Sequence, residues 1–345
     1  MKKATPELGA FDDFARTFGD AGFTLAKPTS DSRAAITLSS SNPAVATVDG
    51  ASGAVSIVGA GTTTFTAAQA ANDDFVAASK TMTFTVRQAI PTLGSMTGAT
   101  KTFGDASFSL TKPSSPSSGA FSFASSNTGV ASVDADGKVT VVGAGTATIT
   151  ATQAASGNYS SSSVAAVVTV GRVATTIANL SLSNLTYGAS DVTLAPRSNN
   201  PSPFTFSSSA PTVLAVNATT GRVRIVGAGT ATITVRQASS ANYEAGSESL
   251  TVQIGRATPT LSSFSAISKD YGDAPFTLTP PESDSPAPFT YESSNPSVAS
   301  IDASTGVVTI RNVTTVGSPV TLTVRQAQTD NYAAIAATTP LIIGR

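Results

Sequence analysis

Residues 139–150 read Val-Thr-Val-Val-Gly-Ala-Gly-Thr-Ala-Thr-Ile-Thr, and the central Gly-Ala-Gly-Thr recurs at residues 59–62 and 227–230. β-Branched residues alternate with small ones on both sides of the glycines, which is typical of half-buried strands. A sequence motif that recurs at a fixed period indicates that the unit of structure is a repeat. We therefore expect one small β module, used several times, to account for almost the whole chain.

An aromatic residue followed by glycine opens each copy. These pairs are Phe18-Gly19, Phe103-Gly104, Tyr187-Gly188 and Tyr271-Gly272. Their spacing of about 84 to 85 residues is much longer than that of helical solenoid repeats. The period predicts four domains, at residues 1–88, 89–172, 173–256 and 257–345.

The two ends of the sequence resemble its internal repeat boundaries. Lys3-Ala4-Thr5-Pro6 matches Arg256-Ala257-Thr258-Pro259, and Ile343-Gly344-Arg345 matches Ile254-Gly255-Arg256. No apolar segment follows Lys2 and Lys3, so we expect no signal peptide here. Two alternatives stay open: a fragment of a longer array, or a compact gene product exported by other means.

Each copy also contains a hairpin signal, in which Asp or Asn ends a short strand and glycine follows within five residues. The Asx residues are Asp49, Asp134, Asn217 and Asp302, and the glycines are Gly53, Gly137, Gly221 and Gly306. An Asx side chain bonds the turn backbone and glycine supplies a positive φ, so a tight hairpin is predicted. Gly-Ala-Gly-Thr is predicted as a second turn. The Ala-rich piece 67–78, interrupted by Asn72-Asp73-Asp74, is predicted as the loop before the last strand.

About seven short strands per repeat are typical of a small Ig-like β-sandwich. The predicted fold class is all-β, with four tandem Ig-like β-sandwich domains in an extended row. The junctions contain no Gly/Ser tract and often include proline, which restricts swing between domains. We expect a length on the order of 150 Å, and a compact envelope in small-angle scattering would contradict it.

Composition excludes several classes of function. Cys, His and Trp are absent, charged residues make up 12% and the formal net charge is −1. Zinc fingers, thiolate metal sites, Ser-His-Asp triads and Cys-His dyads need residues that the chain lacks. The weak charge disfavours nucleic-acid binding, and no apolar run reaches the roughly 18 residues of a membrane span. We expect no enzyme, and no catalytic, cofactor-binding or metal-binding residues.

Two motifs resemble ligand sites. Gly-Ala-Gly-Thr could cradle a phosphate, but such loops precede a helix and usually contain lysine. Asp49, Asp134 and Asp302, or Asp20, Asp105 and Asp273, could bind calcium. Calcium needs six to eight oxygens, and the third copy has Asn217 and Ala189 at these positions. Turn chemistry is the better interpretation, and calcium between domains remains an alternative.

Two types of side chain, lysine and glutamine, could form covalent cross-links. Lys27 and Lys112 occupy equivalent positions, where an isopeptide bond is conceivable, but the later copies have Ala195 and Thr279. A glutamine stands six residues before an aromatic residue in every copy, and a Thr-Gln ester bond that uses this glutamine is conceivable. These pairs are Gln69 and Phe75, Gln153 and Tyr159, Gln237 and Tyr243, and Gln326 and Tyr332. We expect glutamine and aromatic to hold the loop before the last strand, as a tyrosine corner does.

The combined motifs resemble a known family. Ser-Ser-Asn-Pro-x-Val-Ala, the Asx-to-Gly hairpin and Val-Gly-Ala-Gly-Thr-Ala-Thr-Ile-Thr together are similar to the group 2 type of bacterial Ig-like domains, over all four copies. Such domains are found as tandem stalks of intimin- and invasin-like surface proteins and as appendages on phage virion proteins. The resemblance implies an external, non-enzymatic role and transfers no binding residues.

The resemblance leads to three functional expectations. The first is a structural and adhesive rod on a bacterial cell surface, whose partners are neighbouring domains of a larger surface protein and a host-surface or glycan receptor. The second is a phage virion fibre or decoration protein. The third is a lectin-like module, although no aromatic stripe marks a carbohydrate platform. In the fourth copy, residues 311–319 replace Val-Gly-Ala-Gly-Thr and predict a protruding loop.

Overall fold

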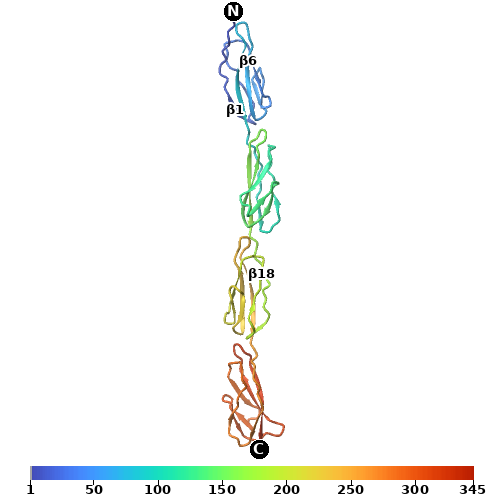
Figure 1. The fold of residues 1–345 in the computed structure, drawn as a ribbon, viewed down its shortest axis with the longest axis vertical. Coiled ribbons are helices and arrows are strands. Elements are labelled where there is room, and N and C mark those ends of the chain that lie inside the picture. Colours follow the sequence, from blue (N-terminus) through green and yellow to red (C-terminus); the bar gives the residue numbers. More distant parts are fainter. Residues whose placement is uncertain (1) are drawn as a thin grey trace. The chain divides into compact units, whose positions relative to one another are not determined.

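The computed structural model describes residues 2–345, and these form strands and turns without any helix. They divide into two compact units after Val173. Each unit contains two β-sandwiches, which Figure 1 separates by colour, blue and green in the first unit, yellow and red in the second. The all-β class predicted from the sequence is confirmed.

The first repeat packs a four-stranded sheet on a three-stranded one. The larger sheet has the order β1-β7-β6-β3 and the smaller has the order β2-β5-β4. Their bounds are β1 Phe14–Thr17, β2 Phe23–Thr24, β3 Ile36–Ser40, β4 Ala46–Val48, β5 Ala54–Ile57, β6 Gly61–Gln69 and β7 Ala78–Arg87. β1 pairs with β7 in parallel, and the other neighbours are antiparallel.

The second and fourth repeats have the same two sheets. In the second, the strands are β8 Ala99–Thr102, β9 Phe108–Ser109, β10 Phe121–Ser125, β11 Ala131–Val133, β12 Lys138–Val141, β13 Gly145–Gln153 and β14 Ser162–Gly171. In the fourth, they are β24 Ile267–Asp270, β25 Phe276–Thr277, β26 Phe289–Ser293, β27 Ala299–Ile301, β28 Val307–Ile310, β29 Val320–Gln326 and β30 Ile335–Gly344.

The third repeat adds a small two-stranded ladder to the same plan. β15 Ile177–Ala178 pairs with β18 Arg197–Ser198. The other strands are β16 Leu185–Thr186, β17 Val192–Thr193, β19 Phe204–Ser208, β20 Leu214–Val216, β21 Arg222–Ile225, β22 Gly229–Gln237 and β23 Gly246–Gly255.

Each repeat has its own hydrophobic core between its two sheets. Alternate residues of the long central strands point inward, as Phe65 on β6 and Phe84 on β7 do in the first repeat. Ile149, Ile233 and Leu322 occupy the corresponding interior of the other three. The period-2 alternation therefore places one face of each strand in a core and leaves the hydroxyl-rich face in solvent.

The predicted turns are present, with one correction to strand bounds. Gly-Ala-Gly-Thr turns β5 into β6, β12 into β13 and β21 into β22, and its second glycine has φ of 142°, 144° or 140°. The prediction that all of residues 67–78 form a loop was wrong. Ala67, Ala68 and Gln69 continue β6, and Ala78 begins β7, because the small Ala67 fills an inward position of β6 next to that of Phe65.

Candidate interdomain joints

A single residue links consecutive sandwiches in each unit. β7 ends at Arg87, and the backbone of Ala89 already belongs to the second repeat: Ala89 N donates to Asn158 O at 3.0 Å, and Ala89 O accepts from Ser160 N at 2.9 Å. Only Gln88 lies between, and its side-chain Nε2 donates to Gly157 O at 2.9 Å. The linker is therefore held by its own side chain and by the backbone of the residue that follows it.

The second unit repeats this arrangement. β23 ends at Gly255, and Ala257 N donates to Asn331 O at 2.9 Å, while Ala257 O accepts from Ala333 N at 2.8 Å. The intervening Arg256 donates from Nε to Thr329 O at 2.8 Å. We call residues 156–160 and 329–333 the docking loops. In both units the linker is clamped to the docking loop of the repeat that follows it.

The docking loop also reaches back to the preceding repeat through an asparagine. Asn158 Oδ1 accepts a hydrogen bond from Ala60 N at 2.8 Å, and Asn331 Oδ1 accepts one from Ala228 N at 2.9 Å. The donors are the central residues of Gly-Ala-Gly at residues 59–61 and 227–229, which we call the glycine turns. One side-chain oxygen thus satisfies an N–H group that the turn leaves without a partner in its own repeat.

The first glycine of each turn allows this approach. A Cβ on Gly59 would lie 2.8 Å from Ala44 O and 3.2 Å from Asn158 Oδ1. A Cβ on Gly227 would lie 3.0 Å from Thr212 O and 3.2 Å from Asn331 Oδ1. A Cβ added at this position would therefore crowd both a backbone oxygen of its own repeat and the incoming asparagine oxygen.

An aromatic pair completes each joint. The rings of Phe18 and Tyr159 meet edge to face with centroids 5.6 Å apart, and those of Tyr187 and Tyr332 do so at 5.5 Å. Burial raises the pKa of the Tyr332 phenol, and the negative charge of Asp284 and the neighbouring Tyr187 act in the same direction. The aromatic-Gly pairs that mark the repeat period in the sequence thus supply a ring to the next repeat.

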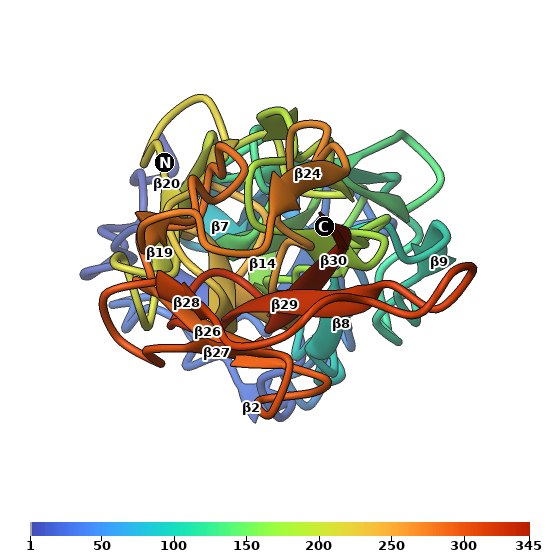
Figure 2. The same cartoon turned by 90° about the horizontal axis from the view of Figure 1, so that it is seen from below.

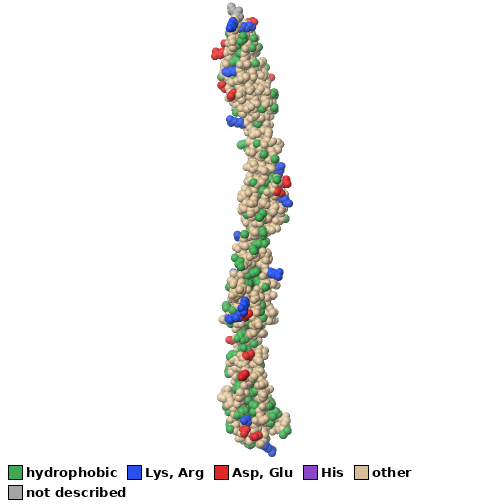
Figure 3. All heavy atoms as spheres, in the orientation of Figure 1, with side chains coloured by type: hydrophobic (Ala, Val, Ile, Leu, Met, Phe, Trp, Pro, Cys, Tyr) green, Lys and Arg blue, Asp and Glu red, His purple; other side chains and the backbone are tan. Residues whose placement is uncertain are grey.

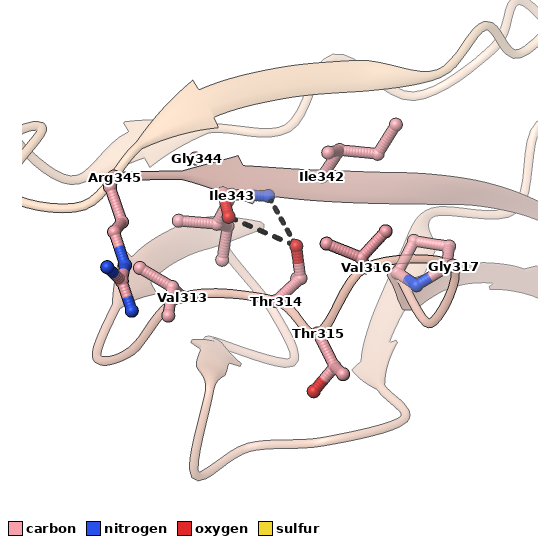
Figure 4. Close-up of a pocket in the computed structure, with 10 residues that line it drawn as sticks. Val313, Thr314, Thr315, Val316, Gly317, Ile342, Ile343, Gly344 and Arg345 are labelled. Atoms are coloured by element: carbon pink, nitrogen blue, oxygen red, sulfur yellow. Dashed lines mark hydrogen bonds between the residues drawn. The ribbon is translucent and has the colours of Figure 1, made fainter.

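The fourth repeat has a different end. Residues 311–319 carry the small bridge Thr315–Ser318, and Val316 is fully exposed. In Figure 2 a red loop extends sideways beyond β29. Thr314 Oγ1 accepts from Ile343 N at 3.0 Å and donates to Ile343 O at 3.1 Å. Between this loop and the end of β30 lies an apolar cavity of about 670 Å³ (Figure 4). The predicted protrusion is confirmed.

The predicted Asx turns are confirmed at the hairpins. Asp302 Oδ1 accepts from the backbone and hydroxyl groups of Ser304 and Thr305, and the Thr305 amide is the main cause that lowers the pKa of Asp302 to about 2. Asp49 is held in the same way by Ser52, which lowers its pKa. Asn217 takes the same role without charge.

The second set of aspartates caps the turn after the first strand. Asp20 accepts from Thr17 N and Asp105 from Thr102 N, both at 2.9 Å, and Asp273 accepts from Asp270 N at 3.1 Å. Within residues 2–345, no group of three or more Asp, Glu, His or Cys side chains is arranged to hold a metal ion. These carboxylates are therefore committed to turn backbone.

The proposed role of the glutamines was wrong. Gln153 does not hold its own loop: Nε2 donates to Ser117 O and Gly119 O at 2.9 Å, and Oε1 accepts from Ser115 Oγ at 2.5 Å. Gln69 and Gln326 make the same bonds to residues 30–34 and 283–287. Each glutamine is buried and ties the end of a central strand to the loop before the third strand, while the aromatic six residues later is free to face the joint in two of the repeats.

Lys112, one of the two lysines considered for an isopeptide bond, lies against an aromatic ring. Lys112 Nζ lies 5.2 Å from the ring centroid of Phe121, as a cation–π pair. On the face drawn in Figure 3, acidic and basic side chains are scattered without a large area of one sign. No helix among residues 2–345 has the length and apolar content for crossing a membrane.

Sequence reasoning missed Asn158, Asn331 and the linker contacts. A signal for them exists, because asparagine precedes tyrosine at residues 158, 242 and 331, whereas Asp74 precedes Phe75 in the first repeat. Asparagine therefore stands at this position in the three repeats that come after another repeat of this chain.

The sequence profile of the immunoglobulin-like domain of intimin matches residues 21–71, 110–155, 197–239 and 283–327. The chain belongs to the intimin immunoglobulin-like domain family. Each match lies within one sandwich, and the four tandem Ig-like domains expected from the sequence are confirmed. Intimin-like Ig domains are non-enzymatic, extracellular adhesion modules.

Solved structures similar to this intimin-like chain include other tandem β-domain proteins. The cis-dimer structure of protocadherin gammaB7 EC3-6 is 15% identical with a TM-score of 0.33, over 98% of this chain and 100% of that chain. Drosophila N-cadherin EC1-4 is 12% identical with a TM-score of 0.26, over 98% and 99%. Sidekick-1 immunoglobulin domains 1-5 are 13% identical with a TM-score of 0.29, over 98% and 81%. At these values the similarity assigns no function, and no curated protein matches the chain.

Proposed function

We propose that the chain is a non-enzymatic structural spacer, a stiff rod of Ig-like domains on a bacterial cell surface that holds adhesive modules away from the cell. The observation that carries this proposal is the joint itself. The same asparagine bond, aromatic pair and clamped one-residue linker occur in both units. The match to the intimin Ig-like domain family supports the adhesive part of the proposal.

The contacts of the joint are individually weak, but the short linker holds them in register, and together they can make the joint stiff. A neutral hydrogen bond contributes about 0.5–1.5 kcal/mol, and an edge-to-face aromatic pair contributes a similar ~0.5–1.5 kcal/mol. A one-residue linker keeps the two surfaces at high effective concentration, so that even these energies favour one orientation.

The strand order also supports a role under tension. β1, near the start of the first repeat, pairs in parallel with β7, which ends it. Opposite forces on the two ends of such a pair load all its hydrogen bonds together in shear. The repeat would then resist extension instead of opening one bond at a time.

Spin labels test the joint directly, because the natural chain has no cysteine and introduced pairs are the only labelling sites. With one label on each of the first two repeats, we expect a narrow distance distribution. Asn158→Ala together with Tyr159→Ala should broaden the distance distribution, while both repeats keep their melting temperatures. Asp74→Ala, at the equivalent position of the first repeat, is the matched control and should leave it narrow.

A broad distribution in the unaltered chain would refute the stiff spacer. The location needs a separate measurement, immunogold labelling of intact source cells and of purified phage particles. Labelling of particles alone would favour a virion fibre or decoration protein. A glycan-array signal lost on altering one loop would favour a lectin-like module.

A further inference from the structure

The fourth repeat follows the path of the glycine turn up to a single position and then departs from it. Arg311 N and Asn312 N both donate to Val298 O, at 2.8 and 3.0 Å. Val58 N and Gly59 N make the same two bonds to Val45 O, at 2.9 and 3.1 Å. Asn312 therefore occupies the place of Gly59, and Val313 occupies the place of Ala60.

The hydrogen bond that forms the joint elsewhere is made internally here. Ala60 N and Ala228 N donate to an asparagine of the following repeat. Val313 N donates instead to Asn312 Oδ1, at 2.9 Å. We propose that Asn312 is a built-in cap that occupies the docking position of the fourth repeat and prevents another Ig-like repeat from docking there, whether it follows in the same chain or belongs to a second copy.

Steric and electrostatic reasons act together in this cap. In the first and third repeats, a Cβ on the first glycine would come within 3.2 Å of the incoming asparagine oxygen, so the Cβ of Asn312 would crowd that oxygen. The incoming oxygen would also meet Asn312 Oδ1, and two acceptors facing each other without a donor are unfavourable. Discrimination by a clash and an already satisfied donor is an established way to reject a wrong partner.

The loop that follows Asn312 also differs from the corresponding segment of the first and third repeats. Residues 313–319 lie beside the end of β30, where they enclose the cavity described above (Figure 4).

A five-repeat chain tests the cap. A copy of residues 89–172, with its own docking loop, is fused directly after Arg345, which matches the linker residue Arg256 in the sequence. Spin labels report the distance between the fourth and the added repeat. We expect a broad distribution in the unaltered fusion and a narrow one after Asn312→Gly.

A second variant keeps the test decisive if Asn312→Gly destabilises the repeat. Residues 311–319 are replaced by Val-Gly-Ala-Gly-Thr, the sequence of residues 226–230, and the distribution should narrow as well. Replacing the added docking-loop asparagine by alanine in this variant should broaden it again. A narrow distribution in the unaltered fusion overturns the cap. Narrowing with the graft but not with a folded Asn312→Gly protein assigns the block to residues 313–319 and overturns the role of Asn312.

The cap deepens the proposed spacer function and depends on the same joint. A label pair on the first two repeats of the same fusion separates the two ideas. If that reference pair is broad, the spacer proposal fails. If it is narrow while every fourth-joint variant stays broad, only the cap fails.

Discussion

Asparagine has opposite effects at two positions of the same repeating pattern. On a docking loop, Asn158 or Asn331 brings an oxygen to the turn of the preceding repeat. At position 312, within the turn itself, the same side chain satisfies the local N–H. An asparagine can therefore join two repeats or satisfy the N–H group of its own turn, and which of these it does depends on which repeat carries its side-chain oxygen.

The buried glutamines allow a comparison within one chain. Gln153 has partners for both ends of its amide, whereas Gln237 Oε1 has none among the described residues. Leaving a buried polar group without a hydrogen-bond partner costs about 1–3 kcal/mol of stability. We expect Gln153→Leu to destabilise the second repeat by about 2–3 kcal/mol, and Gln237→Leu to cost the third repeat less. Denaturant unfolding of the two variants, followed by residue-specific NMR, measures both, and equal losses would contradict the comparison.

Local residue signals predicted turns better than joints. The Asx-to-Gly spacing predicted the bonds of Asp49 and Asp302, because these bonds involve neighbours within a few residues. Asn158 bonds a residue 98 positions away, and the sequence pattern of one repeat holds no information about that partner. The glutamine prediction failed for the same reason, since its partners lie 34 to 43 residues away.

At the scale of elements, the Asx hairpin is the unit with a measurable pH dependence. The pKa of Asp302 is lowered to about 2 by bonds from Thr305 and Ser304, compared with about 3.9 for an unfolded chain. The depressed value means that the carboxylate stabilises the hairpin above about pH 4, and that this contribution is lost as the pH falls through about 2.

The hairpin of the third repeat is the natural control, because Asn217 makes the same bonds without titrating. We expect the Ser304 and Thr305 amide signals to titrate near pH 2, and those of Thr219 and Thr220 to remain unchanged. An NMR titration follows both hairpins in one sample. A midpoint near the unfolded value of about 3.9 at Asp302 would show that these bonds are not kept in solution.

Strand existence was predictable and strand length was less so. Alternation identified the central strands, since burial on one face is recorded in every second residue. It did not extend β6 through Ala67 and Ala68, because Ala67 fills a core position without the β-branched signature. The protruding loop at residues 311–319 was predictable from a difference in length, but its cavity depends on contacts with β30.

At the scale of the whole molecule, the chain has four separate hydrophobic cores. Leu322 is fully buried in the fourth, and a Leu→Ala change in a core costs about 2–5 kcal/mol. We expect Leu322→Ala to lower the unfolding midpoint of the fourth repeat alone, so that this repeat unfolds at a lower denaturant concentration than it does in the unaltered chain.

Hydrogen exchange resolved by repeat measures this effect. Val316→Ala, on a fully exposed side chain of the same repeat, is the control and should stay within about 0.5 kcal/mol of the unaltered chain. An equal shift of all four repeats would mean that the joints couple folding as well as orientation.

The one-residue linker also has a genetic consequence. A segment from Ala89 to Arg172 contains a docking loop and a Gly-Ala-Gly turn, so its duplication or deletion would preserve both kinds of surface at every new boundary. Reach could then change in whole-repeat steps by recombination, with no new interface to evolve. A repeat that carries asparagine at the position of Asn312 could be exchanged in this way only at the end of the series.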